Sequence, residues 1–237
     1  MKNLIRDIIL TFTLFMTSFG AYTQGVSLGK TRVIFSESYS ESVTITNDDN
    51  KPYLIQAGVT TDLDGNLSPH FIVTPPIFRL ENKSTSSMRI LLKDVVSLPN
   101  DKESLFYLNT KIIPSTEKNN PDDEISKLVL ITSFVIKVIY RPDSLSKPTD
   151  IDYRKIKLQN QGKNWSFNNP TPYYFTLTKI TLNKEKYSKS IIIAPYSQTR
   201  VDVNNINKAS WFFINDYGEL SKEFHYKDVD KWSLKIK

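Results

Sequence analysis

The sequence predicts an all-β protein built from two β-sandwich domains. Short runs of β-branched and aromatic residues recur along its 237 residues, turn-forming residues separate them, and hardly any stretch shows a helical period. Apolar residues make up 39% of the chain and aromatic residues 12%, which is typical of a globular protein. A polar stretch at 143–150 divides the runs into two groups, so we expect two antiparallel sandwiches that share an inter-domain cleft.

The first 24 residues are expected to form a secretory signal peptide. Lys2 and Arg6 give it a positive start, the apolar run at 8–20 is short for a membrane span, and small residues follow. Cleavage is expected after Gly20 or nearer to Gln24. Since no other run approaches the length of a transmembrane helix, we expect an exported chain that does not insert into a membrane.

The composition excludes several classes of function. The chain has no Cys, which excludes thiol nucleophiles and thiolate metal sites. Its two His residues, His70 and His225, lie far apart, and no hydrolase, zinc or phosphate-loop motif occurs, so neither an enzyme nor a metal or other cofactor is expected. The acidic run 122–124 is expected to be solvated rather than catalytic. The net charge of +6 is scattered along the chain and does not indicate a nucleic-acid partner.

In the first group, the expected strands lie between clear turn signals. They are Val26–Leu28, Arg32–Phe35, Ser42–Asn47, Tyr53–Thr60, Phe71–Thr74, Met88–Leu92 and Phe106–Ile113. Turns at 48–52 and 62–66 and the pair Pro75-Pro76 separate several of them. Asp101–Leu105 is the exception and is expected to form a single helical turn. The polar stretch Pro114–Glu124 is expected to be a loop.

The longest run, Leu128–Tyr140, is expected to be the single strand around which the chain is organised. Its thirteen residues contain no Gly or Pro and end at Arg141-Pro142. Fully extended, they would reach about 43 Å, twice the length of an ordinary strand. Apolar side chains point to both faces, unlike those of a half-solvated antiparallel strand. Because an exposed apolar edge strand promotes aggregation, this strand indicates a partner outside the protein's own core.

The second group follows the linker at 143–150 and consists of shorter runs. They are Ile156–Leu158, Asn164–Phe167, Tyr173–Leu182, Lys189–Ile193, Gln198–Val203, Ala209–Asn215, Glu223–Tyr226 and Trp232–Ile236. This spacing predicts a second small sandwich. We therefore expect a first domain at 25–145 and a second domain at 146–237.

Seven short sequence motifs, in a fixed order along the chain, resemble those of a known family. They are Gly25–Leu28 with Thr31–Phe35, Asn47-Asp48 with Pro52–Leu54, Thr74–Pro76 with Arg79-Leu80, Asp101–Asn109, Ile136–Pro142, Asn169–Tyr174 and Ile214–Gly218. Together they resemble the PapD-like periplasmic chaperones of pilus assembly, over nearly the whole mature chain. The resemblance implies two immunoglobulin-like domains set as an L, a periplasmic location and no catalysis.

The resemblance also implies partners. Such a chaperone binds, folds and caps fimbrial subunits by lending its long strand to a subunit sandwich that lacks one, and it delivers them to an outer-membrane usher. In register with Lys137, the donor residues fall on Leu128, Leu130 and Thr132, although the third is more usually aliphatic. A shift of the register would move them to Ile125, or to Val129 and Ile131.

Two further sets of residues match family motifs. Arg32 and Lys137, with Thr31 beside them, resemble the cleft pair that grips the C-terminal carboxylate of the subunit. Glu103, Arg141 and Asp216 match a structural inter-domain ion network. The moderate loop and the absence of Cys resemble the short-loop branch of the family.

Four alternatives stay open at this point. Leu128 and Leu130 could face the protein's own core, and Arg32 and Lys137 could be ordinary solvated charges. A β-sandwich adhesin or carbohydrate-binding module would instead use an aromatic platform for sugar stacking, formed by Trp165, Tyr173, Tyr174, Trp211 and Phe212. The free chain could also hide its exposed strand by self-association.

Overall fold

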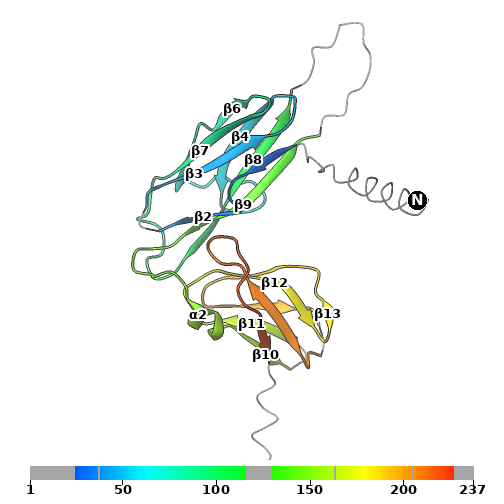
Figure 1. Ribbon diagram of the computed structural model, residues 1–237. Coiled ribbons are helices and arrows are strands. Elements are labelled where there is room, and N and C mark those ends of the chain that lie inside the picture. Colours follow the sequence, from blue (N-terminus) through cyan, green and yellow to red (C-terminus); the bar gives the residue numbers. More distant parts are fainter. Residues whose placement is uncertain (1–24, 37, 116–129, 163, 204, 227–237) are drawn as a thin grey trace, which may run out of the picture.

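The computed structural model describes residues 25–36, 38–115, 130–162, 164–203 and 205–226. Several predicted features lie outside these residues: the signal peptide, the acidic run 122–124, Ile125, Leu128, Val129 and Trp232–Ile236. The described chain forms two β-sandwich domains that meet at an angle (Figure 1). Among the described residues, no helix is long and apolar enough to cross a membrane.

The first domain packs a four-stranded sheet against a five-stranded sheet. The strand orders are β1-β3-β7-β5 and β2-β9-β8-β4-β6. The strands are β1 (Val26–Leu28), β2 (Arg32–Phe35), β3 (Ser40–Asn47), β4 (Tyr53–Thr60), β5 (Phe71–Thr74), β6 (Ile77–Leu80), β7 (Ser84–Leu92), β8 (Ser104–Pro114) and β9 (Thr132–Tyr140). Val43 and Ile45 in β3 are buried while Ser42 and Thr44 are exposed, which is the alternation expected of a strand with one face on the core.

The second domain has its own core between two smaller sheets. The strand orders are β10-β11-β15 and β13-β12-β16-β17, and β14 pairs with β12. The strands are β10 (Lys157–Gln161), β11 (Asn164–Asn169), β12 (Phe175–Leu182), β13 (Glu185–Lys186), β14 (Ile191–Ile193), β15 (Ser197–Val201), β16 (Ala209–Phe213) and β17 (Phe224–Tyr226). Its core contains Phe167, Leu177 and Phe213 and is separate from the core around Phe35 and Ile90 in the first domain.

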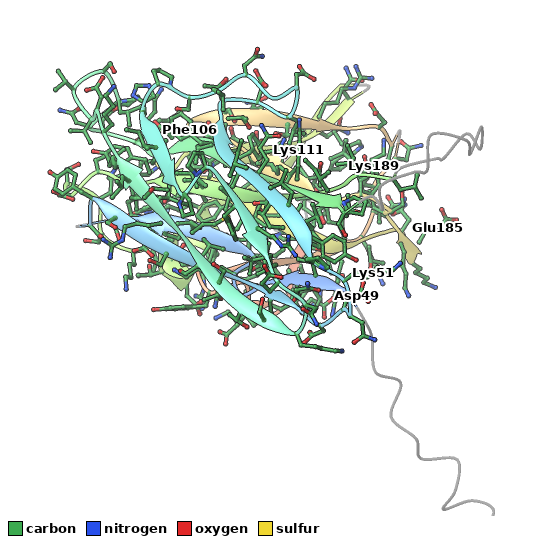
Figure 2. The ribbon with its side chains drawn as sticks, turned by 90° about the horizontal axis from the view of Figure 1, so that it is seen from above. Asp49, Lys51, Phe106, Lys111, Glu185 and Lys189 are labelled. Carbon is green, nitrogen blue, oxygen red and sulfur yellow. The ribbon has the colours of Figure 1, made fainter. Side chains whose placement is uncertain are left out.

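Charged and apolar side chains separate as the hydrophobic effect requires. Lys51, Lys111 and Glu185 are exposed on the outside of the domains, whereas Phe106 packs in the first core (Figure 2). The buried Trp165 and Trp211 also pack in the second core, together with Tyr173. The aromatic platform required by an adhesin is therefore not formed by these three residues.

The longest predicted strand was wrong in its extent and in its pairing. β9 begins at Thr132, whereas Leu130 and Ile131 precede it and are 74% and 56% exposed. β9 is antiparallel to β8 along its whole length, but it is parallel to β2. The sandwich is thus not purely antiparallel. After β1 in the four-stranded sheet, the chain passes to the five-stranded sheet, where β2 pairs with β9 and runs in the same direction.

The helical prediction was also wrong. Asp101–Leu105 forms no helix, and Ser104 already belongs to β8. The described residues instead contain one short helix, α2 (Asp150–Lys155), which begins where we expected the linker to end. The backbone N–H of Thr149 donates to Asp152 Oδ2 at 2.9 Å, so the first turn is capped by a side chain three residues ahead.

Candidate functional site

The candidate site lies where the two domains meet. From the first domain, β2 and β9 place Arg32 and Lys137 directly opposite each other as Cα partners of the parallel ladder. Paired residues on neighbouring strands point to the same face of a sheet, so their two cationic side chains are neighbours. The structure therefore brings together two residues that are 105 positions apart in the sequence (137 − 32).

Both cations donate to the second domain. Arg32 Nη1 donates to the carbonyl oxygen of Ile214 at 3.2 Å, and Lys137 Nζ donates to Thr176 Oγ1 at 2.8 Å. Neither forms an ion pair within the described residues, and Arg32 Nε is buried without a hydrogen-bond partner there. Two cations held by neutral acceptors leave unused capacity for a negative charge.

Burial changes the proton affinity of both groups. Burial, together with the nearby Arg32, lowers the pKa of Lys137 to about 8. Burial also lowers the pKa of Arg32, while Asp216, Tyr153 and Glu103 act in the opposite direction. Arg32 remains a cation at all physiological pH values, and Lys137 is still mostly protonated at pH 7. The pair therefore offers two positive charges in a partly desolvated cleft.

Thr31 lies beside the pair, directly before β2. Its side chain is close to the turn after β16, where a Cβ added to Gly218 would collide with Thr31 Oγ1. Gly218 has a φ of +86°, a backbone conformation that favours glycine. Close approach of the second domain to Thr31 thus depends on a glycine at this turn.

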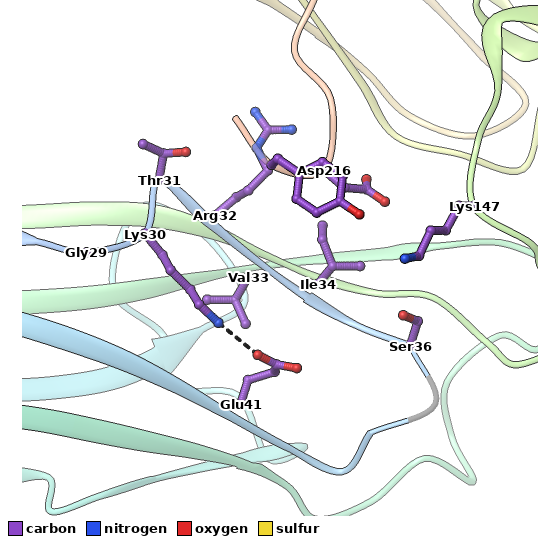
Figure 3. A pocket seen from close by; sticks show the side chains of 11 residues that line it. Gly29, Lys30, Thr31, Arg32, Val33, Ile34, Ser36, Glu41, Lys147 and Asp216 are labelled. Carbon is purple, nitrogen blue, oxygen red and sulfur yellow. Dashed lines mark hydrogen bonds and ion pairs between the residues drawn. The ribbon is translucent and has the colours of Figure 1, made fainter. Parts of the chain in front are cut away.

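A groove of about 500 Å³ runs along the free edge of β2. Thr31 and Arg32 line one end of it, and Lys147 lies toward the other (Figure 3). Lys30 and Glu41 form an exposed ion pair at 2.9 Å on its wall. Lys137 does not line this groove, so Arg32 is the one residue that belongs to both the groove and the cation pair.

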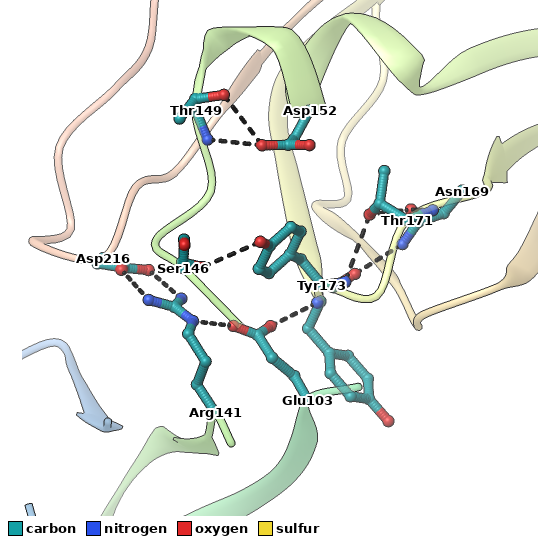
Figure 4. A network of polar contacts seen from close by, with 10 residues as sticks. Glu103, Arg141, Ser146, Thr149, Asp152, Asn169, Thr171, Tyr173 and Asp216 are labelled. Atoms are coloured by element: carbon teal, nitrogen blue, oxygen red, sulfur yellow. Dashed lines mark hydrogen bonds and ion pairs between the residues drawn. The ribbon is translucent and has the colours of Figure 1, made fainter. Parts of the chain in front are cut away.

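A complete ion network holds the domains together next to the cation pair. Arg141, whose side chain is 1% exposed, donates from Nη1 and Nη2 to the Asp216 carboxylate at 2.7 and 3.0 Å, and from Nε to Glu103 Oε1 at 2.7 Å (Figure 4). Glu103 Oε2 also accepts from the backbone N–H of Tyr174 at 2.6 Å. The three residues matched from the sequence are therefore in contact.

Burial and the charged partners shift the pKa values in this network in opposite directions. Burial lowers the pKa of Arg141, but Asp216 and Glu103 outweigh this effect and the pKa is raised overall. Burial raises the pKa of Glu103 despite the opposing charge of Arg141. A guanidinium with two carboxylate partners satisfies its donors internally and has little left for a ligand.

Of the predicted donor residues, Leu130 and Thr132 lie at the far end of β9 from the cleft. Thr132, Phe134, Ile136 and Val138 alternate onto one face, where Phe134, Ile136 and Val138 contribute to the first core. Thr132 and Leu130 are exposed. Leu130 does not face the protein's own core, so that alternative is excluded for this residue. The alternative is not tested for Leu128, which lies outside the described residues.

β9 also has an unpaired edge. β8 covers one side of β9 from Thr132 to Tyr140, whereas β2 covers the other side only from Lys137 onward. Thr132–Ile136 therefore has no partner strand on that side within the described residues. This open edge ends at the cation pair.

Sequence reasoning missed the second-domain acceptors. Thr176 lies two residues after Tyr174, the last residue of a recognised motif, and Ile214 contributes only its backbone carbonyl. A backbone carbonyl leaves no signal in a single sequence. Thr176 did leave a signal in the sequence, because a threonine on a strand next to a recognised motif is a candidate hydrogen-bonding group.

Comparison with known proteins decides the family. A model described as "Pili and flagellar-assembly chaperone, PapD N-terminal domain" matches residues 25–146, and one for the PapD C-terminal domain matches residues 152–225. The chain belongs to this chaperone family. It is therefore a chaperone of the PapD type and not an enzyme, and the predicted fold of two immunoglobulin-like sandwiches is confirmed.

Relatives and solved structures agree with this assignment. The chaperone protein FimC of Escherichia coli K12 is 35% identical, over 90% of this chain and 88% of the relative. MrkB of Klebsiella pneumoniae is 32% identical, over 89% and 94%. The structure of the Salmonella enterica SafA pilin in complex with the SafB chaperone matches with a TM-score of 0.76, at 27% identity over 87% and 98% of the two chains. The Escherichia coli chaperone DraB matches with a TM-score of 0.74, at 32% identity over 86% and 98%.

Proposed function

We propose that this chaperone captures fimbrial subunits by lending them β9 as a missing strand and by holding their C-terminal carboxylate between Arg32 and Lys137. The observation that carries the proposal is the open edge of β9 at Thr132–Ile136, which ends at the cation pair. We also propose that the domains span 25–145 and 146–237.

The direction of the incoming strand follows from β2. β2 is parallel to β9 and begins at Arg32, opposite Lys137. A strand that lies along Thr132–Ile136 in the same direction ends where β2 begins, so its C-terminal carboxylate reaches the two cations. An antiparallel strand would bring a positively charged N-terminus there instead. The electrostatics of the cleft therefore favour parallel addition with the carboxylate as the end stop.

The chemistry of the pair suits a carboxylate. Arg32 has a planar fork with an unused Nε, and Lys137 is a compact charge with further donors. Charge-assisted hydrogen bonds of this kind are stronger than neutral ones, and a partly desolvated cleft strengthens them further. A subunit has a single C-terminal carboxylate, so binding of this group also fixes the register of the subunit strand along β9.

The exposed residues of the donor segment provide the apolar contribution. Leu130 and Thr132 alternate in the register of the core face of β9, so a subunit sandwich placed there would extend the first core. Full burial of a leucine side chain contributes about 1.5–3 kcal/mol. Leu128 would be the third residue of this set. Main-chain bonds along the open edge would add affinity with little dependence on sequence.

The related proteins support fimbrial subunits as the class of partner. SafB has been solved in complex with a pilin, and SfaE, another structural match, is described as a periplasmic chaperone. We infer that the present chain acts in the periplasm after removal of a signal peptide at about residue 24, as its N-terminal composition suggests. We further infer that it hands its subunits to an outer-membrane usher.

The proposal is tested by a pull-down from periplasm with tagged protein. Wild type is compared with Lys137→Ala and Arg32→Ala, and captured proteins are identified by mass spectrometry. Lys186→Ala and Arg89→Ala, which remove exposed charges on β13 and β7, serve as matched controls. A small β-rich subunit should be retained by wild type and both controls and lost from both cleft variants. Equal recovery from folded cleft variants would refute the anchoring role.

A further inference from the structure

The anchoring cations and the groups that hold them belong to different domains. Arg32 and Lys137 are on strands of the first domain, whereas their acceptors, the Ile214 carbonyl and the Thr176 hydroxyl, are in the second. The geometry of the carboxylate site is therefore set across the domain junction, in addition to the network around Arg141.

The two acceptors are joined to each other within the second domain. Thr176 is on β12, and its residue is only 6% exposed. Its backbone carbonyl accepts from the N–H of Ile214 at 3.0 Å, which ties the end of β16 to β12. The hydroxyl that receives Lys137 and the carbonyl that receives Arg32 are thus linked through a single backbone hydrogen bond.

We propose that Thr176 is a positioning residue for carboxylate anchoring, because its hydroxyl holds the Lys137 ammonium beside the Arg32 guanidinium. This inference rests on the proposed function and adds the second domain to the anchoring machinery. A lysine side chain has four rotatable bonds and loses considerable entropy when it is fixed. Its like-charged neighbour Arg32 also repels it. An acceptor on the opposite side counters both effects before the ligand arrives.

Within the part of the chain that the structure describes, the Thr176 hydroxyl is the only hydrogen-bond acceptor of the Lys137 ammonium. Arg32 faces it from β2, and Tyr107 is its Cα partner on β8. The carboxylates of Glu103 and Asp216 are already bound to Arg141. The Thr176 hydroxyl accepts from Lys137 and still has its own proton to donate, so it can remain in place when a carboxylate binds.

The test uses the isosteric substitution Thr176→Val with two companions. Thr176→Ser restores the hydroxyl. Thr178→Val is the matched control, because Thr178 is on the same strand and its hydroxyl accepts from Ser190 Oγ at 3.2 Å, away from the cleft. The probe is a synthetic peptide of alternating valine and threonine with a free C-terminal carboxylate, compared with the same peptide amidated at its C-terminus. The ratio of the two Kd values isolates the anchoring contact from the strand pairing.

The expected result is a change in this ratio. Wild type, Thr178→Val and Thr176→Ser should prefer the free carboxylate, and Thr176→Val should lose about tenfold of that preference, the size expected for one hydrogen bond to a charged group. Binding of the amidated peptide should be unchanged. A preference in folded Thr176→Val equal to that of wild type would overturn the inference. Absence of the preference in wild type would overturn the proposed function, and with it the inference.

A second readout needs no ligand. Without its acceptor, the Lys137 ammonium is left buried beside Arg32, so it should lose its proton at a lower pH than in wild type. NMR titration of the lysine side-chain signals in the free protein measures this directly. A Lys137 titration identical in wild type and Thr176→Val would contradict the positioning role, whatever the peptide result.

Discussion

Two groups of charges lie at the same domain junction, and only one of them is complete. Arg141 is buried and bound to two carboxylates, Glu103 and Asp216. Arg32 and Lys137 are partly buried and side by side, and among the described residues they are held by neutral oxygens of the second domain and by no carboxylate. A complete set of partners indicates a structural role, whereas an incomplete set indicates that the ligand supplies the missing charge.

The difference extends to the two halves of β9. From Lys137 to Tyr140 the strand has neighbours on both sides, and Val138 and Ile139 are buried. From Thr132 to Ile136 it has one neighbouring strand within the described residues, and Leu130 and Ile131 before it are exposed. The half from Lys137 to Tyr140 is therefore part of the protein's own sheet and core, and the half from Thr132 to Ile136 remains available for pairing with a partner strand.

The largest expected effect breaks the complete group. Arg141→Leu leaves Glu103 buried without its cation, which should cost about 3–5 kcal/mol in the free energy of unfolding. Urea unfolding followed by tryptophan fluorescence measures this loss. Arg32→Ala should cost far less, since it removes a cation to which no carboxylate of the described residues is bound. Equal losses in the two variants would show that both groups are structural.

A pH series sharpens the comparison, because only the incomplete group contains a cation that titrates near neutrality. The pKa of Lys137 is lowered to about 8, so this residue is charged below that pH and becomes neutral as the pH rises through it. Subunit capture should therefore weaken as the pH rises from 7 to 9, whereas Arg141 keeps its charge throughout.

Lys137→Arg is the matched variant for this series. An arginine stays charged up to pH values above 12, so the capture that remains in this variant should not fall between pH 7 and 9. Capture is measured at constant ionic strength, since salt also screens the contact. The same decline in wild type and in Lys137→Arg would attribute the pH dependence to another group.

The smallest effect concerns the contact between the turn and Thr31. Gly218→Ala places a side chain at a φ of +86° and against Thr31 Oγ1, so it should cost about 1–2 kcal/mol of stability. The double variant Thr31→Ala/Gly218→Ala removes the collision but not the backbone strain and should recover part of the loss. Thermal unfolding of the three variants separates the two contributions. No recovery in the double variant would show that the collision is relieved in another way.

The strand runs and the charged residues of the inter-domain network could be predicted from the sequence. The strands were predicted from the alternation of apolar and polar residues and from the turn residues between them. The family motifs predicted that Glu103, Arg141 and Asp216 would form one ion network. It did not predict the start of β9 at Thr132, because Leu130 and Ile131 have the same β propensity as the strand itself. Whether such residues extend a strand depends on a neighbouring strand that pairs with them, which a sequence pattern does not show.

Two other features depended on tertiary structure. The parallel pairing of β2 and β9 follows from a crossover between sheets, and strand composition is the same for either direction. The helix Asp150–Lys155 was hidden by breakers around it, although Thr149 and Asp152 had the spacing of a capping box. The acceptors of the cleft, Thr176 and Ile214, came from a different domain than the cations they hold.

The most direct test of the account compares two forms of one subunit, identified by the pull-down. One form has its natural C-terminus and the other is extended by two residues, which moves the carboxylate beyond Arg32 and Lys137. Wild-type chaperone should capture the natural form at least about tenfold better, the loss expected for charge-assisted hydrogen bonds. Lys137→Ala should not distinguish the two forms. Equal capture of both forms by wild type would contradict the claim that the cation pair anchors the end of the subunit.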